Sequence, residues 1–294
     1  MRNVTRGKAE AVAHGAATIV NAIATDEGAA FGVDLYTKAK VELTDEPNVI
    51  KGEITSDPSE NTLLVERAAA RVLEHFKVEK QFGANVKTTS NIPIARGLKS
   101  SSVAANAVVL ATATALGKSL EDLEAVNLGV EAAFDAKVTV TGAFDDACAS
   151  YFGGVVVTNN LERKILLRTS LPENLSVLFH VPPKKAYTAD SDVNRLKTVA
   201  PMVKIAFKEA LSGNFWAALS LNGVIYSSAL GYDASVALLA LNAGAVAAGL
   251  CGKGPAVTAV VSDDKIDQVK AALQRFEGKI IYAQMNREKA EAVT

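Results

Sequence analysis

Residues 93–107 read PIARGLKSSSVAANA, a glycine and three consecutive serines immediately before an alanine-rich run. This run, Ser100–Leu116, favours a helix because alanine has the highest helix propensity. The N–H groups at a helix start and the positive end of its dipole attract anions. Gly97 permits close backbone approach, and serine hydroxyls bond phosphate oxygens or ligate Mg²⁺. The stretch therefore predicts a phosphate-binding loop, and the alternative is that the serines only cap the helix.

The composition narrows the class of protein. The 294 residues allow one large domain or two of about 150 residues, and 49 % hydrophobic residues allow an ordinary core. A formal net charge of −1 gives no general attraction to nucleic acid or to an anionic membrane. Cys148 and Cys251 are too few for a disulfide framework, and the first residues lack the apolar core of a signal peptide. We therefore expect a cytoplasmic protein with no nucleic-acid or membrane partner.

Hydrophobic patterning predicts a mixture of strands and helices. In the first half, strands are expected at Lys38–Thr44 and Ala84–Thr89, and helices at Asn61–Phe76, Ser100–Leu116 and from a capping box at Ser119 to about Ala133. In the second half, strands are expected at Val155–Thr158, Lys164–Arg168, Leu175–Val181, Ala245–Leu250, Ala256–Val261 and Lys279–Ala283, and helices at Ala200–Leu211, Phe215–Ala229, Ala234–Ala243 and Ile266–Phe276. This order indicates α+β domains that meet near residues 150–160.

A second segment whose residues could take part in catalysis is Thr139–Ser150, which reads TVTGAFDDACAS. Asp145 and Asp146 stand among small residues just before Gly153 and Gly154. A carboxylate near a substrate hydroxyl can accept or orient its proton during phosphoryl transfer. The alternative is a solvated turn or a helix N-cap.

A third segment, Gly249–Ala256, reads GLCGKGPA and stands between two apolar runs. Its three glycines allow the backbone to approach a ligand or another loop closely. A tight hairpin is the alternative, because glycine-rich turns are common.

Together the three segments resemble the GHMP kinases, the superfamily of galactokinase, homoserine kinase, mevalonate kinase and phosphomevalonate kinase. Its phosphate loop reads roughly P-x-x-x-G-L-G-S-S-A, and Pro93–Ser102 is similar to it, with Lys99 and Ser102 in place of Gly and Ala. Its mevalonate branch has an Asp eight residues before the second Gly of a Gly-Gly pair, and Asp146 and Gly154 match that spacing.

The third family motif is close to S-G-T-G-P, and here Cys251 and Lys253 replace the Ser and the Thr. Within the superfamily the chain looks most like archaeal-type shikimate kinases. That resemblance rests on residues 15–24 (GAATIVNAIA), 28–35 (GAAFGVDL), 97–102 (GLKSSS) and 141–150, and it extends over essentially the whole chain.

The resemblance implies a two-domain α+β fold. The N-terminal domain would have a left-handed βαβ crossover and the C-terminal domain would be ferredoxin-like, and we place them at residues 1–155 and 156–294. ATP and Mg²⁺ would act in the cleft between them. The implied reaction is phosphorylation of the shikimate 3-hydroxyl, which gives 3-phosphoshikimate and ADP.

The resemblance also implies roles for individual residues. The ATP-binding residues would be Pro93, Gly97, Leu98, Lys99, Ser100, Ser101 and Ser102. Asp146 would be catalytic, and the substrate would contact Asn21, Asp34, Gly142 and Asp145. Mg²⁺ would be held by Ser101 and Asp135, with Glu131 as the fallback for Asp135. A substrate carboxylate needs an Arg, a Lys or polar partners, and the further candidates for it are Arg67, Arg96, Arg195 and Tyr187.

Three alternatives stay open at the level of sequence. The same chemistry can act on another small alcohol such as homoserine or mevalonate. A catalytically silent relative would bind nucleotide or metabolite without turnover, and a purely structural α+β protein would have no affinity for ATP. The sequence fits either a monomer or a homodimer.

Overall fold

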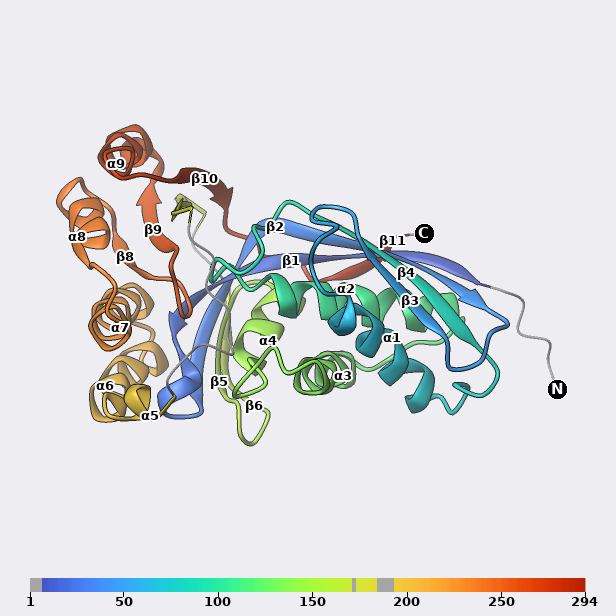
Figure 1. Cartoon of the computed structure of the whole chain (residues 1–294). Coiled ribbons are helices and arrows are strands. Elements are labelled where there is room, and N and C mark those ends of the chain that lie inside the picture. The colour runs from blue at the N-terminus through green and yellow to red at the C-terminus, as the bar shows by residue number, and fades with distance from the viewer. Residues whose placement is uncertain (1–6, 171–172, 184–192, 294) are drawn as a thin grey trace.

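The computed structural model describes residues 7–170, 173–183 and 193–293 (Figure 1). Its elements form two units, each with a sheet and helices packed on it (Figure 1). The first sheet contains β1 (Lys8–Val20), β2 (Glu27–Thr44), β3 (Ile50–Ile54), β4 (Gly83–Ser90), β5 (Val155–Asn159), β6 (Lys164–Thr169) and β11 (Glu291–Val293). The strand order is β11-β1-β2-β4-β3, and β5 pairs with both β2 and β6.

The long β1–β2 hairpin is the backbone of this first unit. In the outer half of β2, Ala39, Val41 and Leu43 are buried, whereas Lys38 and Lys40 are exposed. One face of the sheet carries α1 (Leu63–His75), α2 (Ser100–Ala115), α3 (Asp122–Asp135) and α4 (Phe144–Phe152) (Figure 1). The parallel strands β3 and β4 are joined through α1, which is the expected βαβ unit. Its left-handed sense stays a prediction.

The second unit contains β7 (Leu175–Val181), α5 (Val193–Lys197), α6 (Ala200–Leu211), α7 (Phe215–Leu230), α8 (Ser235–Asn242), β8 (Ala247–Leu250), β9 (Val257–Ser262), α9 (Ile266–Leu273) and β10 (Lys279–Gln284). The sheet order is β10-β7-β9-β8, and every pair is antiparallel. A β-α-β-β-α-β succession in this order is the ferredoxin-like arrangement. The predicted α+β class and the ferredoxin-like unit are confirmed.

Two sequence expectations differ from the strands and helices observed. The division at residue 155 separates β5 from β2, although these strands are hydrogen-bonded neighbours, and it places β11 away from its partner β1. By sheet membership the second unit begins at β7 and the chain returns to the first unit at β11. The capping box at Ser119 is wrong, because α3 begins at Asp122 and its N-cap is Glu121.

No helix within the described ranges is long and apolar enough to cross a membrane.

Candidate active site

The predicted phosphate loop leads directly into α2. Ala95, Gly97 and Lys99 all have positive φ angles, of 56°, 84° and 64°. Left-handed residues that alternate with ordinary ones turn successive N–H groups to one side, as in anion-binding nests. Lys99 is the N-cap of α2, so the serines occupy its first turn and do not cap it. The loop and the positive end of α2 therefore form a site suited to an anion.

Asp145 and Asp146 lie in the first turn of α4 and are both buried. The Asn160 side chain clamps Asp145, since its Nδ2 donates to Asp145 Oδ1 at 2.8 Å and its Oδ1 accepts from the Asp145 N–H at 3.2 Å. Gly28 makes room for the carboxylate, because a Cβ there would lie 2.6 Å from Asp145 Oδ2. Burial, with the neighbouring charge of Asp146, raises the pKa of Asp145 to about 7, against the opposing effect of Lys99.

Lys99 and Asp146 form a buried ion pair. The Lys99 Nζ lies 2.8 Å from Asp146 Oδ2, and the two side chains are 12 % and 7 % exposed. Burial disfavours the charged ammonium, yet the carboxylate of Asp146 and other negative neighbours outweigh it, so the pKa of Lys99 is raised. The second oxygen of Asp146, Oδ1, is buried and has no hydrogen-bond partner among the described residues. This oxygen is therefore available to a ligand.

The third glycine-rich segment packs against the phosphate loop. The Gly252 N–H donates to Thr18 Oγ1 at 3.0 Å, and the Ala256 N–H donates to the Arg96 carbonyl at 3.2 Å. Gly97 is required at this contact, because a Cβ there would lie 2.4 Å from the Cys251 carbonyl oxygen. The segment connects β8 and β9, so it is a hairpin loop that also approaches another loop closely.

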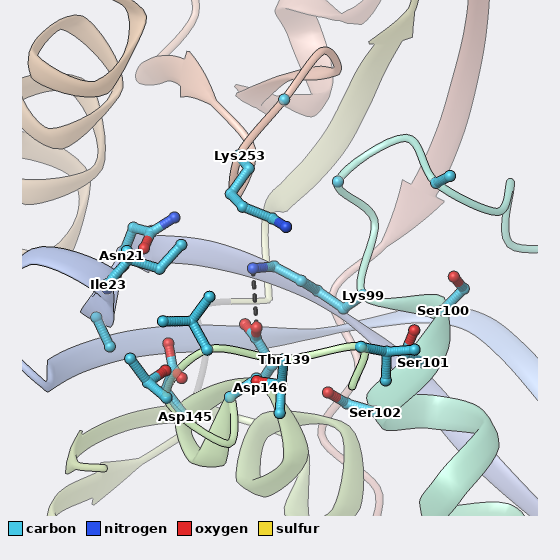
Figure 2. A pocket seen from close by; sticks show the side chains of 18 residues that line it. Asn21, Ile23, Lys99, Ser100, Ser101, Ser102, Thr139, Asp145, Asp146 and Lys253 are labelled. Atoms are coloured by element: carbon cyan, nitrogen blue, oxygen red, sulfur yellow. Dashed lines mark hydrogen bonds and ion pairs between the residues drawn. The ribbon is translucent and has the colours of Figure 1, made fainter. Parts of the chain in front are cut away.

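These segments enclose a cavity of about 140 Å³ to which both units contribute (Figure 2). Its lining comprises Asn21, Ala22, Ile23, Ala95, Gly97, Lys99, Ser100, Ser101, Ser102, Val138, Thr139, Val140, Thr141, Ala143, Asp145, Asp146, Lys253 and Gly254. Serine hydroxyls, two carboxylates and two ammonium groups thus meet in one cavity, which can hold a polar, partly anionic ligand.

A second, larger cavity of about 310 Å³ lies beside the first and shares Ala95, Ser100, Ser101 and Val138 with it. Most of its exposed surface is apolar and comes from residues such as Ile54, Leu64, Val65, Ile94 and Ala104, but polar residues including Glu60, Asn61 and Lys137 line it as well. The phosphate loop and the start of α2 therefore stand between a polar cavity and an apolar one.

Several residues expected at the site line the polar cavity: Asn21, Gly97, Lys99, Ser100, Ser101, Ser102, Asp145 and Asp146. Four others lie outside both cavities, namely Pro93, Leu98, Asp34 and Gly142. Leu98 is buried in the core, and Asp34 is exposed and accepts from the Gln284 N–H at 2.8 Å. Gly142 faces α3, since a Cβ there would lie 2.8 Å from Val130.

Asp135, which was expected to hold the metal, lies outside the polar cavity and is bound by Arg71. Arg71 holds its carboxylate with two hydrogen bonds of 2.6 and 2.7 Å, and these bonds keep the pKa of Asp135 below its usual range. Asp135 lines neither cavity, and the fallback Glu131 pairs with Arg163 at 2.5 Å. The spacing to Asp146 places Asp135 at the end of α3, where its carboxylate contacts Arg71 of α1.

Three of the candidates for a substrate carboxylate, Arg67, Arg96 and Arg195, line neither cavity. Arg67 and Arg195 are exposed, and Arg96 lines neither cavity. Tyr187 lies outside the described residues.

Sequence reasoning did not single out Thr139, Thr141 or Asn160, and it treated Lys253 only as a departure from a motif. Thr139 and Thr141 line the cavity, and Asn160 fixes Asp145 from beyond β5. The interval between Asp145 and Asn160 has no helical or strand periodicity that would place the two side chains together. A polar residue directly after a buried strand was the only signal available for Asn160.

Known protein families match both halves of the chain. Residues 63–154 match the family described as GHMP kinases N terminal domain, and residues 206–279 match GHMP kinases C terminal. A shikimate kinase of Methanosarcina mazei is 46 % identical over 94 % of each chain. A shikimate kinase of Halobacterium salinarum is 41 % identical over 92 % of this chain and 94 % of its own.

Solved structures show the same fold at low sequence identity. A homoserine kinase from Cytophaga hutchinsonii has a TM-score of 0.76 at 19 % identity and covers 100 % of this chain and 99 % of its own. The mevalonate kinase of Methanococcus jannaschii has a TM-score of 0.73 at 17 % identity, with 97 % and 100 % covered. The full-length similarity to the archaeal enzymes and the two matched domains show that this chain belongs to the GHMP kinase family.

Proposed function

We propose that this protein transfers the γ-phosphoryl group of ATP to the 3-hydroxyl of shikimate in the cytoplasm and releases 3-phosphoshikimate and ADP. The observation that best supports phosphoryl transfer concerns the two carboxylate oxygens of Asp146. Lys99 binds one of them, and the other is buried without a hydrogen-bond partner among the described residues. Its position in the polar cavity, beside the serine-bearing start of α2, supports a role at the acceptor hydroxyl. The choice of shikimate is supported by identities of 41 to 46 % to archaeal shikimate kinases.

The two cavities suit the two halves of ATP. The apolar cavity adjoins Ser100 and Ser101 and would accept the base and ribose. The phosphates would then follow the left-handed loop from Ala95 to Lys99 and meet the N-terminus of α2. The γ-phosphorus would thereby reach the polar cavity, where the acceptor lies.

Asp146 accepts the proton of the attacking hydroxyl while that oxygen bonds to the γ-phosphorus. The bond from the γ-phosphorus to the bridging oxygen breaks, and ADP leaves with that electron pair. Lys99 Nζ holds the other carboxylate oxygen of Asp146, Oδ2, at 2.8 Å. Because the proton acceptor and the phosphate loop are joined by this ion pair, the loop itself orients the base.

Asp145 and Asn21 complete the acceptor side of the cavity. Asn160 fixes the orientation of Asp145, as described above. Asn21 is held through its backbone, since its N–H donates to Asn222 Oδ1 at 3.0 Å and its carbonyl accepts from the Tyr226 hydroxyl at 2.9 Å. Both side chains can therefore present polar groups to the remaining hydroxyls of the substrate without reorganisation.

The residues of the polar cavity fit Mg²⁺. Oxygen donors dominate, with serine and threonine hydroxyls beside carboxylates, and hard cations prefer such donors. The described residues contain no cluster of three or more His, Cys, Asp or Glu side chains that would cage a metal alone. Ser101 would therefore hold the ion together with phosphate oxygens, and when bound it would neutralise charge on the phosphates.

The proposal is tested by following ADP release with Mg²⁺-ATP against shikimate, homoserine and mevalonate. Release that depends on shikimate, with a single phosphate ester on the 3-oxygen by ³¹P NMR, is the expected result. Release with homoserine or mevalonate alone would keep the kinase chemistry and overturn the substrate. Binding of ATP without release in any arm would identify a silent relative.

A further inference from the structure

Asn160 connects the end of β5 to the first turn of α4 through both ends of its side chain. Its Oδ1 accepts from the Asp145 N–H at 3.2 Å, and its Nδ2 donates to Asp145 Oδ1 at 2.8 Å. Asn160 is buried, and its own N–H donates to the Asp26 carbonyl at 2.7 Å. The Asp145 N–H lies in the first turn of a helix, so it has no acceptor within α4. Asn160 therefore supplies the acceptor that this helix start lacks.

These bonds determine the orientation of the Asn160 amide group. A backbone N–H can only donate, so the amide oxygen faces the Asp145 nitrogen and the amide nitrogen faces Asp145 Oδ1. The Thr158 hydroxyl completes the arrangement, because it donates to Asn160 Oδ1 at 2.7 Å. Asn160 Nδ2 also donates to Thr141 Oγ1 at 3.4 Å. Asp145 Oδ1 must therefore act as an acceptor toward Asn160.

The second oxygen of Asp145, Oδ2, is the one that Asn160 leaves to other partners. Asp145 lines the polar cavity together with Asp146 (Figure 2). Oδ2 fits beside Gly28, where a Cβ would lie 2.6 Å from it. A proton on Oδ1 would point at the N–H donor of Asn160, so a protonated Asp145 carries its proton on Oδ2. In that form Asp145 has one O–H group to donate.

The surroundings of Asp145 and Asp146 differ. Asp146 has an ammonium group at 2.8 Å, that of Lys99, whereas Asp145 has the neutral amide of Asn160. Burial and the charge of Asp146 raise the pKa of Asp145 to about 7. The charge of Lys99 opposes this rise, as do hydrogen bonds from Asn160 and from the Asp146 backbone. The other titratable groups near Asp145 are Lys253 in the cavity, and Cys148 and Tyr226, whose pKa values are raised by burial and by the charge of Asp145.

We propose that Asn160 is a positioning residue that makes Asp145 donate a hydrogen bond from Oδ2 to an oxygen of the acceptor, next to the hydroxyl that Asp146 deprotonates. This inference rests on the proposed function, because it takes shikimate as the acceptor. A donor at this place selects substrates that carry a second oxygen beside the reacting hydroxyl, as a vicinal diol does. One carboxyl group then gives a hydrogen bond while its neighbour accepts a proton.

The first test measures the KM for shikimate at pH 6, 7 and 8, with saturating Mg²⁺-ATP, in the wild type, Asp145→Asn and Asp145→Leu. The KM of the wild type should rise about tenfold from pH 6 to pH 8, because a carboxyl group with a pKa of about 7 loses its proton in this range. Asp145→Asn keeps an acceptor for Asn160 and places an N–H donor at the position of Oδ2. Its KM should therefore lose the pH dependence and be lower than that of the wild type at pH 8. Asp145→Leu should raise the KM roughly 5- to 100-fold at pH 6.

The second test isolates Asn160. Asn160→Asp removes the amide donor, and the double variant Asn160→Asp/Asp145→Asn restores a hydrogen bond between the two positions with its direction reversed. Stability to urea should recover in the double variant. The amide oxygen at position 145 would then face the acceptor, so the KM should stay roughly 5- to 100-fold above that of Asp145→Asn.

Asn159→Asp is the matched control for Asn160→Asp. Asn159 Oδ1 accepts from the Glu162 N–H at 3.0 Å, and a carboxylate can accept the same bond. The side chain of Asn159 does not line the polar cavity. The KM for shikimate and its dependence on pH should therefore match those of the wild type.

Infrared difference spectra of the wild type and Asp145→Asn at pH 6 give a readout that needs no turnover, since a protonated carboxyl group has a C=O stretch that a carboxylate lacks. Absence of that band would overturn the proposal, and so would equal increases in KM in Asp145→Asn and Asp145→Leu at pH 6. Recovery of the KM together with stability in the double variant would overturn the positioning role of Asn160. If the wild type phosphorylates only homoserine or mevalonate, the proposed function fails, and the infrared band and the same variants with that alcohol still decide the role of Asp145.

Discussion

The ammonium nitrogen of Lys99 lies 2.8 Å from Oδ2 of Asp146, and both side chains are almost completely shielded from water. This ion pair joins the left-handed end of the phosphate loop to the first turn of α4. Buried ion pairs add little net stability over apolar residues, but removing one partner leaves an uncompensated charge. Removal of either partner should therefore destabilise the site.

Replacing Lys99 by Met should destabilise the protein by about 3–5 kcal/mol, because Asp146 would remain buried without its cation. The measurement is urea unfolding at neutral pH. Lys87→Met is the matched control: its partner Glu53 is 2.7 Å away, but those side chains are 50 % and 58 % exposed, so the loss should stay below about 1 kcal/mol. Equal losses in the two variants would contradict a structural role for the buried pair.

Asp146→Asn should lower kcat by roughly 10²–10⁴-fold, because the amide cannot accept the hydroxyl proton. ATP binding, followed by calorimetry, should persist. Asp135→Asn provides a control carboxylate that lies outside the cavity and is bound to Arg71. It should leave kcat and the dependence on Mg²⁺ concentration unchanged.

A nearly normal kcat in Asp146→Asn would remove Asp146 from catalysis. A higher Mg²⁺ requirement in Asp135→Asn would instead show that this carboxylate leaves Arg71 during the reaction and serves the metal.

The local sequence was sufficient to predict the structure where the functional residues and the helix that positions them lie in one continuous segment. The glycine and serines before the alanine-rich run predicted both α2 and the loop at its start, and the structure has both. The second unit was also predictable, since the strands and helices expected from Leu175 onward match those observed except for α5. The first strands were harder: the second half of β1, residues 15–20, and the inner half of β2 are rich in small residues and buried on both faces, so they lack alternation.

Contacts between distant segments were not predictable. Lys99 was expected at the phosphates because of its position in the loop, and only the fold reveals that it neutralises Asp146. The carboxylate of Asp135 has the spacing of a family ligand, yet Arg71 of α1 binds it. Side-chain direction at the end of a helix depends on neighbouring elements, and a single sequence does not specify those.

Gly97→Ala should separate two loops that meet in the site. A Cβ would lie 2.4 Å from the Cys251 carbonyl oxygen and 3.0 Å from that of Gly254, and both are backbone atoms. Gly117→Ala is a matched control, because its φ of 65° imposes similar backbone strain but nothing lies within 4 Å of the added atom. The control should cost about 1–2 kcal/mol of stability with normal kinetics.

In Gly97→Ala the additional clash should raise the KM for ATP and lower kcat. Steady-state kinetics and thermal unfolding of the two variants distinguish the effect of backbone strain, which both share, from that of the clash between the loops, which only Gly97→Ala has. If Gly97→Ala had the same KM for ATP and the same kcat as the control, close contact between the two loops would not be required for activity.

Asp145 should make stability depend on pH. Burial raises its pKa to about 7 from an ordinary value of 3.8, so the folded protein keeps a proton that the unfolded chain releases between about pH 4 and pH 7. Because the folded state binds more protons in this window, the contribution of Asp145 to the free energy of unfolding decreases as pH rises through it. Above pH 7 the carboxylate is ionised in both states, and the folded protein bears the cost of burying its charge.

Asp145→Asn removes the titration and can keep a hydrogen bond to Asn160. Compared with the wild type, the variant should therefore become progressively more stable to unfolding between pH 4 and pH 7 and keep that gain at pH 8. Urea unfolding of both proteins at pH 5, 6, 7 and 8 measures the difference. Parallel stability curves would mean that Asp145 ionises as readily inside the folded site as in the unfolded chain, with Lys99 and Asn160 compensating fully for its burial.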